Sequence, residues 1–411
     1  MTDGPPALTI RIRPNDSEKA FLFEGIGGRT VAVGSKRSLE QAIFEQASLR
    51  TLLEDMKKIG GGALELGLPQ ADQLLQKLHE AGKLVLYGLL GDDVIDYAAD
   101  LRELVADSLI AAGAAETVPW VHVTTPDNDP IAHAIPFELI PFRASHPPRS
   151  IANDESRLAE VLDGFLGFTA VVRRDRGDVF SGGMLARPAE GIPIKLFQNL
   201  SLKNAEAEMN YFCNTAGFDP DGPWPIGALA PQDFKETLLR QIFDPRARID
   251  GTPRSSPDQI YHFACHCDTF GDQNVHRLIL QGDDGKALPM PLKDLRLRLL
   301  DLSENRATAP CDMPLIFLNA CGAAAVDPRQ LGSFVQFFLL NRNRGLIGAQ
   351  IMIPDEFAVA FAELFYSELV TNGRSVGEAV LLARRKLAER KKNMLGLLYM
   401  HYGPSELRLA A

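Results

Sequence analysis

The chain has 411 residues, 45% of them hydrophobic, enough to bury the cores of roughly two or three globular domains. Its net charge of −10 argues against a nucleic-acid duplex or an anionic membrane as the main partner. The sequence has neither an apolar run long enough to cross a membrane nor a signal-peptide pattern, so we expect a cytoplasmic protein. Its five scattered cysteines predict thiols rather than a disulfide framework.

The first part of the chain predicts a small β structure followed by helices. Residues 8–34 alternate apolar and polar positions in three short pieces, which is typical of an antiparallel sheet or hairpin. The GIGGR stretch at 25–29 reads as a turn, because it lacks the third glycine of a phosphate-binding loop. From residue 39 to about 110 the apolar period becomes helical, with breaks at 60–62 and 91–93.

Strands and helices then alternate, which predicts an α/β fold with a mostly parallel sheet flanked by helices. The helical segments include 204–215, 231–243 and 357–370, and Ser375 with Glu378 forms a capping box that begins the last long helix. The basic cluster at 383–392 reads as the solvated face of that helix. The predicted strands are 119–125, 167–174, 192–200, 259–266, 314–321 and 344–353.

Two of these strands end in reactive side chains. The first, IYHFACHCDTF, presents His266 with Cys267, and the second, PLIFLNACG, presents Cys321. Because ligands bind at the carboxyl ends of parallel strands, the two tips would face one crevice if the strands are neighbours. A thiol attacks a carbonyl only as thiolate, and a nearby imidazole can take its proton and later protonate the leaving amine. The pattern therefore indicates a nucleophile and an acid/base.

Other interpretations of these residues are open. A lone cysteine in an apolar strand is usually a small buried hydrophobe, and a lone histidine is usually structural. Zinc binding by His262, Cys265, His266 and Cys267 is disfavoured, because consecutive strand residues point to opposite faces. The sequence contains no Walker A or HExxH motif. Cys321 lies in N-A-C-G, 55 residues after His266, close to the histidine-to-cysteine spacing of about 50 in caspases.

The ordered motifs of residues 70–411 resemble the caspase-like CHAT domain peptidases, relatives of caspases and separase. The segments HFACH and IFLNACGAAAV are similar to that family's histidine and cysteine strands. GLIGAQIMIPDEFAVAFAELFYSEL and GRSVGEAVLLARRKL are similar to its glycine-rich strand, aspartate-containing loop and two closing helices. LYMHYGP resembles its terminal strand, IAHAIPFELIPF resembles the segment that opens the domain, and AEAEMNYF resembles the helix after the next strand.

This resemblance implies an N-terminal β/helical extension, a degenerate caspase-like half and a catalytic half, at residues 1–65, 66–190 and 191–411. The glycine- and proline-rich stretch at 181–193 supplies the seam between the halves. The resemblance further implies a cysteine endopeptidase without a cofactor, with Cys321 as nucleophile and His266 as acid/base. The oxyanion would be held by the backbone N–H groups of Cys321 and Cys267.

Three positions of this sequence affect whether its site can perform the family's chemistry. Cys267 replaces the glycine common in the family, so a side chain crowds the oxyanion site and a positive φ would be costly. Ile351 stands where many members carry a tryptophan that lines the substrate groove. Asp355 matches the family's loop aspartate, which either contacts substrate or caps the helix that follows.

The substrate pocket would be formed by Asp327 in the loop after the nucleophile and by Gln350, Ile351, Met352 and Asp355. Its carboxylates favour Arg or Lys before the scissile bond, and an apolar pocket walled by Ile351 and Met352 is the alternative. The expected partners are a protein substrate and a separate regulatory or sensor protein, in a bacterial stress or antiphage pathway by analogy. The competing functions are an inactive caspase-like interaction module and a small-molecule amidase.

Overall fold

The computed structural model describes residues 4–13, 19–35, 63–113, 118–125, 135–142, 150–174, 183–225, 230–270, 275–304, 313–320 and 333–410, with scattered positions between 37 and 59. The chain divides into two compact units. Unit 1 comprises residues 1–182 and 374–407, and unit 2 comprises residues 183–373 and 408–411. The division of the sequence at 65/66 and 190/191 stays a prediction. None of the described helices is both long and apolar enough to cross a membrane.

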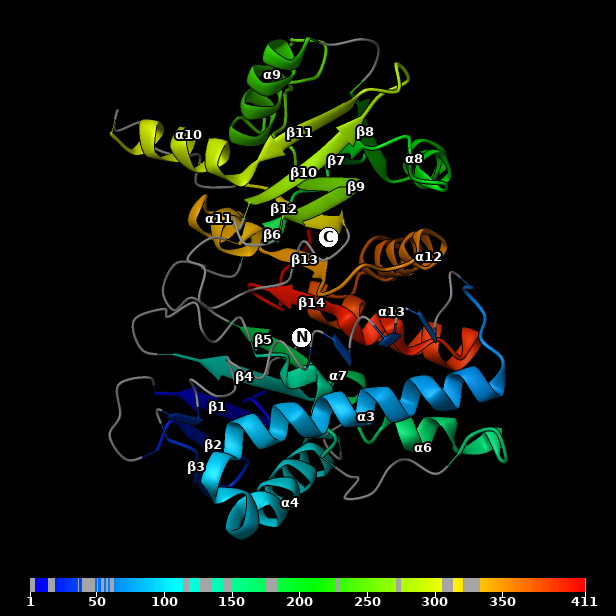
Figure 1. The fold of residues 1–411 in the computed structure, drawn as a ribbon. Helices are drawn as coiled ribbons and strands as arrows, with labels where there is room; N and C mark the ends of the chain where they lie inside the picture. Colours follow the sequence, from blue (N-terminus) through cyan, green and yellow to red (C-terminus); the bar gives the residue numbers. More distant parts are fainter. Residues whose placement is uncertain are drawn as a thin grey trace. The chain divides into compact units, whose positions relative to one another are not determined.

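Unit 1 is built on a sheet whose described strands run in the order β3-β2-β1-β4-β5 (Figure 1). The strands are β1 (Leu8–Ile12), β2 (Phe21–Gly25), β3 (Thr30–Val33), β4 (Trp120–Thr124) and β5 (Val171–Arg174). The predicted N-terminal hairpin is present, and β1 also pairs with β4 in parallel, so the N-terminal strands belong to the same sheet as the later ones.

The helices of unit 1 match the predicted helical region where the structure describes it. A 3-10 turn at Gly91–Asp93 separates the two long helices at the predicted break, whereas the break at 60–62 lies outside the described residues. The helices are α3 (Leu68–Leu90), α4 (Val94–Gly113), α6 (Leu158–Leu162), α7 (Leu166–Thr169) and α13 (Val376–Lys391), and the chain returns to a strand at β14 (Tyr399–Tyr402).

A buried charge cluster connects α13 with the rest of unit 1. Arg174 and Glu138 form an ion pair in which each side chain is 1% exposed. Arg384 of α13 lies 3.8 Å from Glu138 and donates hydrogen bonds to the backbone oxygens of Gly167 and Tyr399. The prediction that residues 383–392 form a solvated basic face is therefore wrong for Arg384, because these oxygens and Glu138 give its guanidinium partners inside the core.

Unit 2 holds a mixed sheet (Figure 1). Two of its central strands are fully buried. Strands β7, β8, β9, β12 and β13 are parallel, while β10 and β11 add an antiparallel edge. Their bounds are β7 (Ile192–Gln198), β8 (Phe218–Trp224), β9 (Ile260–Phe270), β10 (Val275–Gln281), β11 (Ala287–Pro291), β12 (Leu315–Ala320) and β13 (Leu346–Ala349), with the short β6 (Met184–Leu185) pairing β15 (Arg408–Leu409). The predicted α/β class is confirmed.

Helices cover both faces of this sheet because its strands carry apolar residues on both sides. His262 of β9 lies among aromatic rings of α8 and α12, whereas the next residue, Phe263, contacts Phe338 of α11. In Figure 1, α8 and α12 accordingly lie on one side of the strands and α10 and α11 on the other. The helices are α8 (Ala205–Asn214), α9 (Pro231–Phe243), α10 (Leu292–Glu304), α11 (Phe334–Leu340) and α12 (Asp355–Tyr366).

Several elements differ from the sequence prediction, and three of them show why. Residues 218–224 form β8 although their prolines and glycine predict a loop, and pairing on the β7 side is compatible with proline in a strand that has one described neighbour. The segment 167–174 begins as helix α7 and becomes strand only at Val171. The predicted strand 344–353 is reduced to β13, after which the chain turns toward α12.

Candidate active site

The strands that carry the two predicted catalytic residues are direct neighbours. β9 and β12 are parallel, and their register pairs Phe263 with Leu318 and Cys265 with Ala320. Cys265 and Ala320 are the residues immediately before His266 and Cys321, respectively. Cys321 itself lies outside the described residues. The described strands thus run in step to the last residue before each member of the predicted pair.

His266 is half-buried near the carboxyl end of β9 and contacts the loop that leaves the adjacent strand β7. Its Nε2 lies 3.2 Å from the hydroxyl oxygen of Ser201. Ser201 in turn donates from Oγ (2.6 Å) and from its backbone N–H (2.9 Å) to Oδ1 of Asn199, which is 1% exposed. Sequence reasoning missed Asn199, near the end of the predicted strand 192–200, and Ser201, directly after it, although both lie at the edge where ligands of parallel sheets bind.

The same loop contacts the predicted substrate-binding aspartate. The backbone N–H of Lys203 donates to Oδ2 of Asp355, at 3.0 Å, and Asp355 is the first residue of α12. The loop residue that contacts Asp355, Lys203, is therefore only two positions after Ser201, which contacts His266. This contact serves the α12 terminus and the β7 loop together, and it is compatible with a structural role as well as a substrate-binding one.

The other predicted pocket residues follow β13. Gln350 is half-buried, Ile351 is 4% exposed and Met352 is 46% exposed, so the isoleucine faces the core while the methionine faces outward. Asp327 lies outside the described residues. The part of the pocket that these residues would form stays a prediction.

Cys267 adopts ordinary strand geometry. It pairs with Leu278 of β10 and does not take a positive φ. The backbone strain expected from the replacement of glycine therefore does not arise, although the half-buried side chain is present. Within the described residues, no group of three His, Cys, Asp or Glu side chains could hold a metal ion.

A buried polar cluster lies on the His266 side of the sheet. His262 precedes His266 by four residues on the same strand, and both therefore face α8 and α12. His262 Nε2 lies 2.9 Å from Oε1 of Glu208, and its Nδ1 lies 3.0 Å from the hydroxyl of Tyr366. Asn319 donates to the same oxygen of Glu208, at 2.5 Å. We call Glu208, His262, Asn319 and Tyr366 the Glu208 cluster. Its hydrogen bonds connect strands β9 and β12 to the helices that cover them.

Burial shapes the titration of the groups around the Glu208 cluster. It raises the pKa of Tyr366 well above the ordinary value, and the charge of Glu208 acts in the same direction. Burial and Glu208 likewise raise the pKa of Glu363 on α12. Tyr366 therefore keeps its proton as a hydrogen-bonding hydroxyl rather than titrating.

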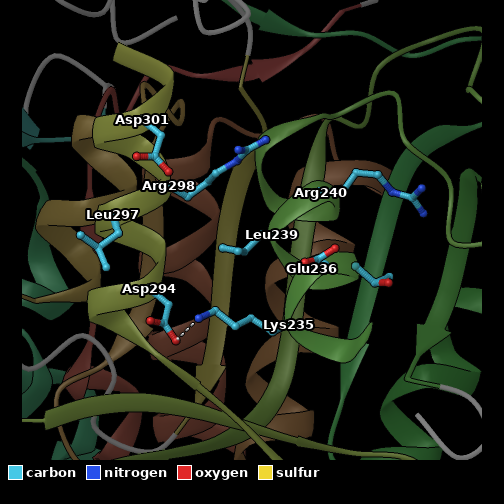
Figure 2. A pocket seen from close by; sticks show the side chains of 9 residues that line it. Lys235, Glu236, Leu239, Arg240, Asp294, Leu297, Arg298 and Asp301 are labelled. Carbon is cyan, nitrogen blue, oxygen red and sulfur yellow. Dashed lines mark ion pairs between the residues drawn. The ribbon is translucent and has the colours of Figure 1, made fainter. Parts of the chain in front are cut away.

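A surface groove of about 620 Å3 lies away from this site, between α9 and α10 (Figure 2). Lys235 of α9 and Asp294 of α10 point toward each other across it and form an ion pair of 3.1 Å. Leu239 and Leu297 add apolar surface, and the charged side chains of the lining carry both signs. None of the lining residues is one that the sequence predicts to be catalytic.

Comparison with known proteins gives partial matches. Over 115 residues the chain is 32% identical to a protein named a probable protease from Vitiosangium sp., a match that covers 28% of this chain and 15% of that protein. Two crystal structures of the Saccharomyces cerevisiae separase–securin complex align over 88% of this chain, at 13% identity and TM-scores of 0.40 and 0.39. The chain spans 23% and 22% of those separase chains and less than a quarter of each relative.

The family model of the CHAT domain matches residues 216–401, a range that contains β9, β12 and the strand ends analysed above. The matched region begins within unit 2 and ends within unit 1. Residues 216–401 therefore match the CHAT domain, which confirms over this range the resemblance to caspase-like CHAT peptidases predicted from the motifs.

Proposed function

We propose that the protein is a cytoplasmic cysteine endopeptidase that cleaves protein substrates through an acyl-enzyme on Cys321, with His266 as acid/base. The observation that carries the proposal is the register of β9 and β12, which pairs Cys265 with Ala320 directly before the two residues. The CHAT match and the protease-named relative support the same reaction class.

His266 takes up and gives the protons in the proposed reaction. His266 takes the thiol proton of Cys321, and the thiolate attacks the carbonyl carbon of the scissile peptide bond. The oxyanion accepts hydrogen bonds from the backbone N–H groups of Cys321 and Cys267. The C–N bond then breaks as His266 protonates the leaving amine. Water, deprotonated by His266, finally attacks the thioester, which releases the carboxylic acid and restores the thiol.

The pocket for the residue before the scissile bond would comprise Asp327, Gln350, Ile351, Met352 and Asp355. Its carboxylates favour Arg or Lys. Of these groups, Asp355 has the clearest support, because the loop it contacts through Lys203 also carries Ser201, the partner of His266. We further propose that a separate protein regulates the chain, in a bacterial stress or antiphage pathway.

A peptide-library digest with the purified chain tests this function directly. We expect cleavage after Arg or Lys, and its complete loss in Cys321→Ala and in His266→Ala, while both variants keep the circular dichroism spectrum of the wild type. Labelling by a thiol-reactive probe should require Cys321 and should be much slower in His266→Ala. Undiminished proteolysis by Cys321→Ala would refute the proposal.

The two competing functions give different results in the same experiments. An inactive interaction module would show no turnover with any peptide and no enhanced labelling of Cys321 over Cys213, an exposed thiol in the same unit. A small-molecule amidase would show normal labelling of Cys321 and hydrolysis of small amides, but no cleavage within longer peptides.

A further inference from the structure

The hydrogen bonds behind His266 determine which ring nitrogen carries its proton. Asn199 is the first fixed point: its Nδ2 donates to the backbone oxygen of Ile279, at 2.8 Å. This contact requires the amide nitrogen on the β10 side, so Oδ1 must face Ser201. Asn199 also donates its backbone N–H to the oxygen of Ala264, at 2.8 Å, which fixes its position beside β9.

Ser201 is the second fixed point. Its Oγ lies 2.6 Å from Oδ1 of Asn199, and an amide oxygen can only accept, so the single hydroxyl proton of Ser201 is directed at Asn199. The lone pairs of Oγ remain for other partners. Nε2 of His266 lies 3.2 Å from this oxygen and must therefore be the donor of the contact between them.

We infer that Asn199 and Ser201 are positioning residues that hold neutral His266 as the tautomer protonated on Nε2, so that Nδ1 is the base that receives the proton of the nucleophile. This inference deepens the proposed function and rests on it for its catalytic meaning. Nε2 keeps its proton both in this tautomer and in the imidazolium. The hydrogen bond to Ser201 therefore persists while Nδ1 takes up and releases a proton, and the ring need not turn between steps.

The tautomer can be measured without any turnover. In protein labelled with 15N-histidine, two-bond proton–nitrogen correlations distinguish a protonated nitrogen from an unprotonated one, and His266→Gln assigns the signal among the eight histidines. In the neutral form of His266, we expect Nε2 to be protonated and Nδ1 unprotonated. A neutral His266 protonated on Nδ1 would overturn the inference, whether or not the chain has peptidase activity.

Variants of the two positioning residues test the cause. Ser201→Ala should leave a mixture of tautomers and lower kcat by about tenfold with little change in KM, because one orienting hydrogen bond is lost. Ser201→Thr keeps the hydroxyl and should retain both properties. In Asn199→Ala the hydroxyl proton of Ser201 is released to face His266, so the tautomer protonated on Nδ1 should become populated.

The control is Ser255→Ala, an exposed serine of the same unit, which should change neither tautomer nor kcat. Thermal unfolding of each variant identifies any loss of folded protein, and the NMR signal of a folded variant remains decisive. A Ser201→Ala protein that keeps the single Nε2-protonated form would show that Ser201 does not set the tautomer. If no variant, wild type included, cleaves any peptide while the tautomers change as expected, the proposed function fails and the positioning role stands.

Discussion

Glu208 Oε1 on α8 lies 2.9 Å from Nε2 of His262 on β9, and the same oxygen accepts from the side chain of Asn319 on β12. One buried carboxylate therefore connects a covering helix to both strands of the candidate site. Asn319 is two residues from Cys321 in the sequence, and His262 is four from His266. The Glu208 cluster is thus placed to fix the relative height of the two strand ends.

Glu208→Ala should destabilise unit 2 by about 2–4 kcal/mol, because it leaves two buried polar groups without their acceptor. Urea unfolding followed through Trp224, in a Trp120→Phe background, measures the change for this unit alone. Glu206→Ala, an exposed glutamate in the first turn of the same helix, is the control and should cost less than about 1 kcal/mol. Equal losses in the two variants would contradict the assigned role.

The buried pair of Glu138 and Arg174 should make unit 1 sensitive to acid. Burial by itself would raise the pKa of Glu138, but the charges of Arg174 and Arg384 outweigh it and lower that pKa below 4.5. A group with a depressed folded-state pKa contributes stability above its unfolded pKa and loses it as the pH falls through the folded value.

In Glu138→Gln, the unfolding free energy of unit 1 should therefore be lower near neutral pH and should fall less steeply below about pH 4.5. Urea unfolding followed through Trp120, in a Trp224→Phe background, gives this free energy at each pH. A Glu138→Gln curve parallel to that of the wild type throughout the acid range would show that the pair does not contribute to the pH dependence.

The capping box of α13 predicts a smaller, local effect. Ser375 Oγ accepts from the backbone N–H of Glu378, and the carboxylate of Glu378 accepts from the backbone N–H of Ser375, at 2.9 Å. Ser375→Ala should cost about 1 kcal/mol of the stability of unit 1, whereas Ser375→Thr should cost little. Equilibrium unfolding with Trp120 as the reporter compares the two variants, and indistinguishable values would argue against the cap.

Asp355 permits a separation of charge from structure. Asp355→Asn keeps an oxygen that can accept from Lys203 but removes the charge, whereas Asp355→Ala removes both. If Asp355 contacts the substrate cation, the Asn variant should lower kcat/KM for peptides with Arg before the scissile bond by about tenfold and leave an apolar substrate unaffected. Wild-type selectivity in the Asn variant, with loss only in Ala, would assign Asp355 to loop positioning.

The sequence predicts those features of the fold that depend on local pattern. The apolar runs of β7, β9 and β12 and the apolar stripes of α8, α9 and α12 are visible because period and burial coincide. Strand β8 was missed because its prolines and glycine indicate a loop, and only pairing with β7 makes it a strand. The burial of Arg384 was missed for a similar reason. Its partners, Glu138 and the backbone oxygen of Gly167, are distant from it in sequence.

The candidate site follows the same division. His266 was identified by its place at a strand end, a property of one segment. Ser201 and Glu208 act through contacts across 65 and 54 residues of sequence, so only the sheet order reveals them. Polar residues at the end of a predicted parallel strand and just after it, such as Asn199 and Ser201, are the signal that could have indicated the loop.

The placement of residues 374–407 in unit 1 has a consequence for the order in which the protein can form during translation. Every described strand of unit 2 except the short β15 is synthesised before α13, which carries Arg384 to the buried Glu138. Since domains fold as units during synthesis, the strands that lead to His266 and Cys321 can assemble on the ribosome while unit 1 still lacks a core helix. The unit that begins first along the message therefore receives its last long helix only after residues 183–373 of the other unit have been made.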